Sequence, residues 1–203
     1  MTRLLVAALL ALVLGGCGSP PGGGTPWPFA EDEEARRWGD GPYGLVLVTD
    51  AGRDAASWEG PASTFAAEGM TVVALDAGST ALRVQGAILA LQDAGVERVA
   101  VLAAGSGTVP AMELGATWPH LVDQLILLSA RGNISRLGDF PKLFVASVDE
   151  GAAAEARRMA DEAPGDWNAL YLAPGDASGQ AILEGEGADG AMEAILVRLE
   201  ERR

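Results

Sequence analysis

Cysteine, histidine and lysine each occur once in this sequence of 203 residues, as Cys17, His120 and Lys142. The lone cysteine has no disulfide partner within the chain. A metal centre of the histidine and cysteine type needs several such ligands close together. We therefore expect neither a metal ion nor another cofactor.

Basic residues are also few, because 14 lysines and arginines stand against 28 aspartates and glutamates, for a formal net charge of −14. Nucleic acids and anionic lipid surfaces are bound through clustered lysines and arginines. The charge balance thus argues against nucleic acid as a partner. The acidic excess favours solubility and does not by itself indicate a mechanism.

The N-terminal apolar run is short. It follows Arg3, extends from Leu4 to Leu14, and lacks the length of a membrane-spanning helix. Residues 1–16 therefore read as an export signal. The stretch L-G-G-C that ends at Cys17 resembles the bacterial lipobox, whose cysteine is lipidated and becomes the mature N-terminus.

The lipobox resemblance implies an exported protein that is lipid-anchored to the extracytoplasmic face of the bacterial cell membrane. Acyl chains hold a protein to a bilayer through buried CH₂ groups, each contributing roughly 0.8 kcal/mol. The alternatives are an ordinary secretory signal with an incidental cysteine, or an uncleaved anchor. Residues 17–43 are predicted to be a spacer, Gly/Pro-rich at first and then acidic, with a short helix in the charged part.

Residues 44–203 have the length of one domain. Within them, short apolar runs alternate with longer helical patterns. The predicted strands are Gly44–Asp50, Met70–Asp76, Arg98–Ala104, Gln124–Ala130, Lys142–Val148 and Asn168–Pro174.

Nearly continuous apolar strands are typical of a parallel sheet that is covered on both faces. The alternation of strand and helix predicts a three-layer α/β sandwich with a mostly parallel sheet of about six strands. In such a sheet, functional sites lie beyond the carboxyl ends of the strands.

Two stretches resemble the α/β hydrolases, especially the small dienelactone-hydrolase-like and esterase-like members. Residues 45–76 are similar to the family's strand, oxyanion loop, first helix and next strand, and residues 93–115 to the strand and helix around its nucleophile. The resemblance implies a minimal α/β-hydrolase-like fold without a lid over residues 44–203.

The family places its nucleophile in G-x-S-x-G directly after a strand. Aligned on the strand V-A-V-L, these five positions fall on residues 103–107, so that Gly105 stands where the serine belongs. The elbow imposes a positive φ that glycine adopts at little cost. The weaker alternative makes Ser106 the nucleophile, flanked by Ala104 and Thr108 instead of glycines. In the favoured register the hydroxyl of Ser106 is expected to cap the next helix.

A serine nucleophile also needs a base beside it. The family's histidine follows the last strand, where this chain has Ser178 at about the corresponding place. His120 precedes a strand and belongs to the opposite edge of the sheet, roughly 17–20 Å away, beyond hydrogen-bond reach. Lys142 begins its strand, so a Ser–Lys pair meets the same obstacle.

The triad acid of the resemblance would be Asp149, and without a histidine to orient we expect it to cap the following helix. In the oxyanion loop, many family members have His-Gly where this chain has Thr49 and Asp50. A carboxylate at that place repels a developing oxyanion.

Three further sites remain open at this level. Ser106 with Asp149 could form a hydrolase without histidine. The stretch A-A-G-S-G-T-V-P is a partial phosphate loop, with Pro110 in place of its last glycine and no following lysine. A loosely bound Ca²⁺ or Mg²⁺ could use acidic residues near the carboxyl ends, namely Asp50, Asp54, Asp76, Asp149, Glu150 and Asp176.

The sequence therefore predicts an exported, membrane-anchored lipoprotein with a non-catalytic α/β-hydrolase-like domain. Its degenerate triad positions are Gly105, Asp149 and Ser178, and its expected partner is an unknown small molecule or envelope protein. The alternatives are a serine esterase or dienelactone-hydrolase-like enzyme that uses Ser106, and a purely structural envelope protein.

Overall fold

The computed structural model describes residues 23–30 and 33–201. The predicted export signal and the lipidation site at Cys17 lie outside this range. Within it, no helix is both long enough and apolar enough to cross a bilayer.

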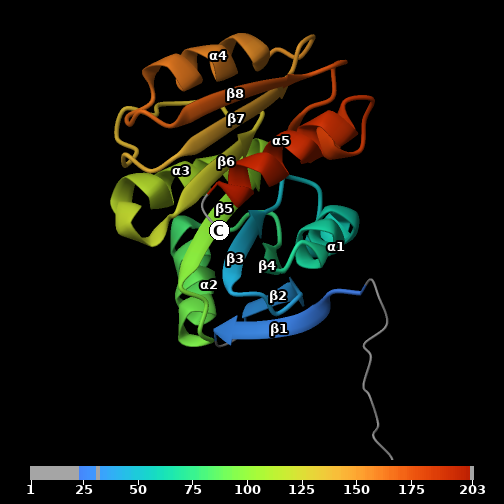
Figure 1. Ribbon diagram of the computed structural model, residues 1–203, viewed down its shortest axis with the longest axis vertical. Coiled ribbons are helices and arrows are strands. Elements are labelled where there is room, and N and C mark those ends of the chain that lie inside the picture. Colours follow the sequence, from blue (N-terminus) through green and yellow to red (C-terminus); the bar gives the residue numbers. More distant parts are fainter. Residues whose placement is uncertain (1–22, 31–32, 202–203) are drawn as a thin grey trace, which may run out of the picture.

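One sheet of eight strands runs through the domain in the order β1-β2-β4-β3-β5-β6-β7-β8 (Figure 1). Neighbouring strands from β4 to β8 are parallel, whereas β1 pairs with β2, and β2 with β4, in antiparallel fashion. The strands are β1 (Thr25–Ala30), β2 (Glu33–Trp38), β3 (Tyr43–Val48), β4 (Met70–Leu75), β5 (Arg98–Ala104), β6 (Gln124–Leu128), β7 (Lys142–Ser147) and β8 (Asn168–Ala173).

All six predicted strands are present, as β3 to β8, but the predicted number is wrong because β1 and β2 come from the segment expected to be a spacer. In that segment the helix expected in the charged part is wrong too. Ala35 and Trp38 are buried, so packing of β2 against β4 outweighs the helical preference of its Glu and Arg residues. Pro26 and Pro28 lie on β1, the outermost strand, where a missing N–H is tolerated.

The described residues form five α-helices and four 3₁₀ turns, of which all but η4 and α5, which follow β8, lie between strands. Gly69 and Gly95 follow the first two α-helices with φ of +80° and +97°, the left-handed conformation in which helices commonly end. The helices are α1 (Glu59–Ala67), α2 (Ala81–Asp93), α3 (Thr108–Thr117), α4 (Ala153–Glu162) and α5 (Ala188–Glu200), and the 3₁₀ turns are η1 (Ala55–Trp58), η2 (Gly105–Gly107), η3 (Pro119–Leu121) and η4 (Gly179–Leu183).

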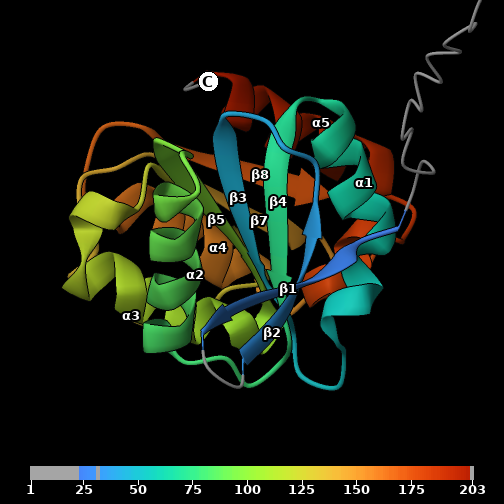
Figure 2. The ribbon, with the colours of Figure 1, turned by 90° about the horizontal axis from the view of Figure 1, so that it is seen from below.

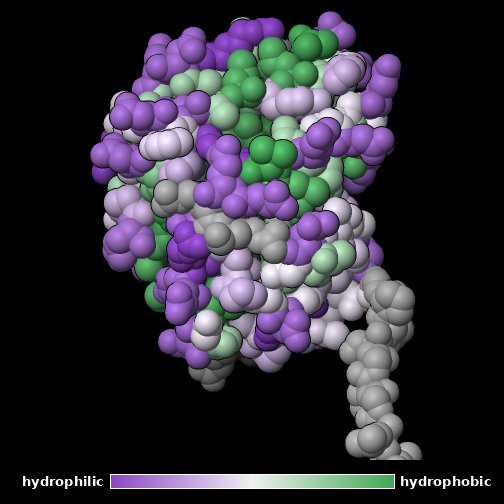
Figure 3. All heavy atoms as spheres, viewed as in Figure 1, coloured by the Kyte–Doolittle hydropathy of each residue, from purple (hydrophilic) through white to green (hydrophobic). Residues whose placement is uncertain are grey.

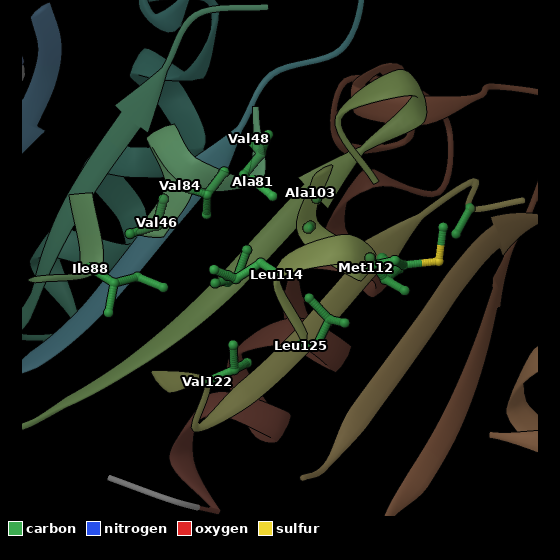
Figure 4. Close-up of a cluster of buried hydrophobic side chains, with 14 of the residues drawn as sticks. Val46, Val48, Ala81, Val84, Ile88, Ala103, Met112, Leu114, Val122 and Leu125 are labelled. Atoms are coloured by element: carbon green, nitrogen blue, oxygen red, sulfur yellow. The ribbon is translucent and has the colours of Figure 1, made fainter. Parts of the chain in front are cut away.

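The helices form two layers around the sheet. Helices α2, α3 and α4 pack on one face, and α1 and α5 on the other (Figure 2). Strand β3 shows the division, because Val46 and Val48 belong to the first apolar core and Leu45 and Leu47 to the second. Figure 4 shows residues of the first core, where side chains of β3 and β5 meet those of α2 and α3.

Because the strands β3 to β8 are parallel, the loops that follow them all lie along the same edge of the sheet. Strand β3 lies between β4 and β5. The connection after β3 leads to β4 on one side, and the connection after β5 leads to β6 on the other side. The loops after β3 and β5 therefore face each other across the crevice where ligands bind in sheets of this kind. The face seen in Figure 3 is mostly hydrophilic, with apolar areas over α5 and β8.

Candidate functional site

The turn after β5 is a sharp elbow made of two glycines with different roles. Gly105 has φ of +50°, a conformation that glycine adopts at little cost. Gly107 has an ordinary φ, but a Cβ there would lie 2.7 Å from the carbonyl oxygen of Val48. Helix α3 can thus begin close against β3 only with glycine at 107. The backbone of Ser106 lies between them at the mouth of the turn.

The carboxylate of Asp50 occupies the space beside this elbow. An ideal Cβ on Gly105 would lie 2.2 Å from Oδ2 of Asp50, and one on Gly179 would lie 2.3 Å from the same atom. Both glycines have positive φ, of +50° and +58°. Asp50, which follows β3, thus fills the place that a nucleophile on Gly105 would take, and it fits because neither neighbour has a side chain.

One oxygen of this carboxylate accepts hydrogen bonds from the site's backbone amides. Oδ1 of Asp50 accepts from the N–H of Ala51 at 2.7 Å and from that of Ser106 at 2.9 Å. Ala51 belongs to the loop after β3, and Ser106 directly follows the elbow position Gly105. Serine hydrolases of this fold build their oxyanion hole from backbone N–H groups at these two places. The chain's own anion therefore takes the amides that would stabilise a reaction intermediate.

The hydroxyl of Ser106 is also engaged. It donates to Oδ1 of Asp50 at 3.1 Å and accepts from the N–H of Ala51 at 2.8 Å. Its expected capping of α3 is wrong, because the N-cap is Gly107 and no side chain caps the helix. Among the described residues, the acceptor of the Ser106 hydroxyl is thus a carboxylate oxygen that also accepts two backbone N–H groups.

Ser129 is a site residue that the sequence reasoning missed. Directly after β6 it has φ of +55°, unique among the described non-glycine residues. Its hydroxyl accepts from the N–H of Gly179 at 2.7 Å and donates to Glu150 at 2.8 Å. A serine at the end of a predicted strand carries no signal of this conformation, because only the neighbouring loops select it. The hydroxyl joins the loops after β6, β7 and β8.

Glu150, rather than Asp149, is the acid of the loop after β7 that reaches the site. Glu150 lines a cavity above the elbow, described below, and its carboxylate accepts a hydrogen bond from the N–H of Ser147 at 3.3 Å. Asp149 does not line it. The predicted capping of α4 by Asp149 is wrong, since the N-cap is Ala152 and lacks a side-chain hydrogen bond.

Ser178, the residue at the family's histidine position, lies at the start of η4 and lines the same cavity. The structure thus brings Asp50, Gly105, Ser106 and Ser178 together. It leaves His120 in η3, before β6, and Lys142 at the first position of β7, so that both lie at the amino ends of strands whose carboxyl ends form the site.

Two contacts hold the loop after β3 against η4. The guanidinium of Arg53 binds both carboxylate oxygens of Glu184, with one N–O distance of 2.9 Å. This contact lowers the pKa of Glu184 and raises that of Arg53, in each case chiefly through the hydrogen bond. The amide of Gln180 donates to the hydroxyl of Ser57 at 2.9 Å. These two contacts fix the loop that carries Asp50 against η4.

A cavity of about 370 Å³ opens above the elbow. Its volume falls within the range of small-molecule sites. Carboxylates, hydroxyls and one guanidinium line most of it. The lining residues are Asp50, Gly105, Ser106, Thr108, Val109, Ser129, Arg131, Glu150 and Ser178.

The acidic residues considered for Ca²⁺ or Mg²⁺ do not form a centre. Asp54 accepts from the N–H of Ser57 at 3.0 Å, and Asp76 from that of Ala55 at 2.7 Å. Within residues 23–30 and 33–201, no group of three or more potential ligands is placed to hold a metal ion.

Lys142 is fully buried at the opposite edge of the sheet. Its ammonium donates to the carbonyl oxygens of Gly138, Phe140 and Pro164 at 2.6–2.7 Å. Burial lowers the pKa of Lys142 to about 8. The only lysine is thus a structural cation that ties together two loops.

The fold of the chain is similar to the folds of solved α/β hydrolases. A monoacylglycerol lipase of Paleococcus ferrophilus matches with a TM-score of 0.69 at 11% identity, over 85% of this chain and 100% of the lipase. MGS-MChE2, an α/β-hydrolase enzyme from a sediment metagenome of the lagoon of Mar Chica, matches with 0.68 at 13%, over 88% and 99%. The enol-lactonase of Burkholderia xenovorans LB400 matches with 0.62 at 14%, over 83% and 97%.

No protein-family profile and no curated protein sequence matches the chain. The structural likenesses, all at low identity, establish an α/β-hydrolase-like fold with one mostly parallel sheet.

Proposed function

We propose that this domain is a non-catalytic α/β-hydrolase-like module that binds a ligand in the cavity above Gly105. The observation that carries the proposal is the carboxylate of Asp50, which accepts the N–H groups of Ala51 and Ser106. An anion fixed at that place opposes the negative charge that acyl transfer develops there. The open cavity of about 370 Å³ favours binding over a purely structural role.

The competing function is an esterase that uses Ser106, and the geometry disfavours it. The serine hydroxyl already accepts one hydrogen bond and donates another. Activation of a serine requires a base that takes its proton and returns it to the leaving group. The described residues around Ser106 offer only carboxylates for this task.

The lipid anchor at Cys17 is the second part of the proposal, and its support is the sequence L-G-G-C after an apolar run. Strand β1 begins at Thr25, so only residues 18–24 separate the proposed anchor from the sheet. At about 3.5 Å per residue, even an extended connection keeps the domain within roughly 25 Å of the bilayer surface. The module is therefore proposed to work at the membrane surface of the cell envelope.

A fluorophosphonate probe with intact-mass detection tests the non-catalytic assignment. We expect no covalent adduct on the wild-type protein after prolonged incubation. An adduct that disappears in Ser106→Ala would establish the esterase instead, and one that disappears only in Ser129→Ala would establish a different serine nucleophile. Either result removes the proposed function.

The anchor is tested separately by metabolic labelling of the full chain with an alkyne-bearing fatty acid in a bacterial host. We expect label on the wild-type chain and none on Cys17→Ser. An unlabelled wild-type chain that is exported and released would contradict the anchor, and it would leave the binding assignment to its own test.

A further inference from the structure

A second cavity adjoins the first along α3. It has a volume of about 490 Å³ and lies between α3 and the loop that follows β6. The two cavities share Val109 and Arg131 in their walls. Asp50 and Glu150 line only the first, and Arg136 only the second. The cavities therefore form one groove with Val109 and Arg131 at its middle.

The acidic end of this groove has carboxylate oxygens available for a ligand. The three hydrogen bonds that Asp50 accepts from described residues fall on Oδ1, and Oδ2, which lies beside Gly105 and Gly179, accepts none from them. The two bonds accepted by Glu150 fall on Oε2 and leave Oε1. A ligand ammonium group placed between such oxygens gains charge-assisted hydrogen bonds.

The basic end presents two guanidinium groups, of which that of Arg131 is near enough to Glu155 to help lower the pKa of that carboxyl. Within the described part of the chain, neither Arg131 nor Arg136 makes a hydrogen bond or an ion pair, although the protein carries a formal charge of −14. Other arginines, such as Arg53 and Arg158, are paired with glutamates. A guanidinium whose N–H groups make no hydrogen bond within the described residues is suited to a carboxylate from outside.

The loop that carries Arg131 is fixed in place. The N–H of Gly132 donates to Glu155 at 3.4 Å, and its carbonyl accepts from Arg158 at 3.0 Å. Both partners belong to α4, which is anchored in the first core through Met159. The guanidinium therefore extends from a held backbone, which reduces the entropy lost on binding.

Helix α3 supplies an apolar wall between the two charged ends. Val109 is 59% exposed on this helix, an unusual degree for a valine, and Met112 follows it along the same cavity. Glu113 also lines the second cavity and weakens a site for anions alone. The first cavity, with two carboxylates and one guanidinium, likewise disfavours a simple anion.

We infer that the groove binds a dipolar ligand of the amino-acid or short-peptide class. Its ammonium group lies against Asp50 and Glu150, its carboxylate against Arg131, and an apolar side chain against Val109. This inference rests on the proposed function as a binding module, because a catalytic site would require the same cavity for other groups.

Calorimetric titration with a matched set of ligands tests the inference. The probes are leucine, leucyl-leucine, leucyl-leucinamide, which lacks the carboxylate, and N-acetyl-leucyl-leucine, which lacks the ammonium group. We expect leucine or leucyl-leucine to bind. Because each charged end makes charge-assisted hydrogen bonds, the amide and the acetylated peptide should bind about tenfold more weakly or worse. The comparison of leucine with its dipeptide distinguishes a free amino acid from a peptide as the ligand.

The matched variants are Arg131→Ala and Arg157→Ala. Arg157 is an exposed arginine of α4 that lines neither cavity, so its replacement changes the net charge equally without touching the groove. We expect Arg131→Ala to weaken binding about tenfold and Arg157→Ala to leave it unchanged. Because both side chains are exposed, neither variant should affect folding.

Three outcomes overturn the inference: no binding by leucine or leucyl-leucine, equal binding of the amide and the free peptide, or equal effects of the two arginine variants. Failure of the titration without fluorophosphonate labelling removes the dipolar ligand and leaves the non-catalytic assignment in place. Labelling of a serine removes that assignment regardless of the titration.

Discussion

The carboxylate of Asp50 lies where a side chain on Gly105 would begin, with Oδ2 only 2.2 Å from the ideal Cβ position. The two residues follow neighbouring strands, β3 and β5, so the sheet itself brings them together. The carboxylate of Asp50 thus fits beside the elbow only because Gly105 has no side chain. The absence of a side chain at position 105 and the position of the Asp50 carboxylate are therefore one structural feature.

This complementarity predicts that Gly105→Ala destabilises the domain through Asp50. Gly52→Ala is the control, because Gly52 also has positive φ, of +78°, while a Cβ there meets nothing within 4 Å. The left-handed backbone should cost about 1–2 kcal/mol in either variant. Displacing a carboxylate with three hydrogen bonds should add roughly 1–3 kcal/mol for Gly105→Ala alone.

Urea denaturation of the single variants and of Asp50→Ala/Gly105→Ala measures the coupling between the two positions. We expect the double variant to be more stable than the sum of the single effects predicts. Additive effects would show that the two residues do not share the space.

Ser129 predicts an unusual order of stabilities among its variants. Ser129→Ala leaves the N–H of Gly179 without an acceptor and keeps the positive φ, so it should cost roughly 1–3 kcal/mol. Ser129→Gly loses the same hydrogen bonds, but glycine adopts the positive φ without strain. Its free energy of unfolding should therefore be about 1 kcal/mol higher than that of Ser129→Ala. An alanine variant as stable as the glycine variant or more so would contradict the strained conformation.

Trp38 tests whether β2 belongs to the folded domain. Its side chain is 5% exposed within the second core, so Trp38→Ala should cost about 3–5 kcal/mol in unfolding free energy. Trp167 is 68% exposed, and Trp167→Ala should change stability by no more than about 0.5 kcal/mol. Equal stability of the two variants would restore the segment before β3 to the role of a spacer.

Lys142 predicts a pH dependence of stability with a defined sign. Burial holds its pKa at about 8, below the unfolded value of about 10.4, so the unfolded chain binds more protons between these two pKa values. The free energy of unfolding should therefore rise as the pH increases from 8 towards 10. Tyr43, whose pKa burial and the hydrogen bond to Asp123 raise, works in the opposite direction only above its ordinary pKa near 10.

Chemical denaturation between pH 7.5 and 9.5 measures the effect of Lys142 before tyrosines titrate. Lys142→Met is expected to be less stable at every pH, because three carbonyl oxygens lose their donor, and to lack the rise. A wild-type stability that stays level or falls across this interval would contradict the prediction.

The fold was predictable from the sequence wherever apolar periodicity is strong. The strands β3 to β8 are nearly continuous apolar runs of the sequence. Strands β1 and β2 were not predictable in this way. Their prolines and charges read as a spacer, and only pairing with β4 makes them strands.

The site was predictable only in part, for a related reason. Sequence alignment placed Gly105, Ser106 and Ser178 near one another, because each follows a recognisable strand or helix signal. It named Asp149 where the structure places Glu150, since a one-residue difference in a turn reverses which side chain faces the cavity. It placed Asp50 in the oxyanion loop but did not predict that its carboxylate accepts the N–H of Ser106, and it gave no sign of Ser129. Both contacts join loops that are distant in sequence.

Amide hydrogen exchange of Ala51 and Ser106, in the wild-type protein and in Asp50→Ala, tests the central claim most directly. A hydrogen bond to a carboxylate is worth roughly 1.5–3 kcal/mol, so the Ser106 amide should exchange on the order of ten- to a hundredfold faster in the variant. The Ala51 amide, which keeps the Ser106 hydroxyl as an acceptor, should be accelerated less. Amides within β5 should be unaffected. Unchanged exchange at Ala51 and Ser106 would show that the hole is empty, and would contradict the account.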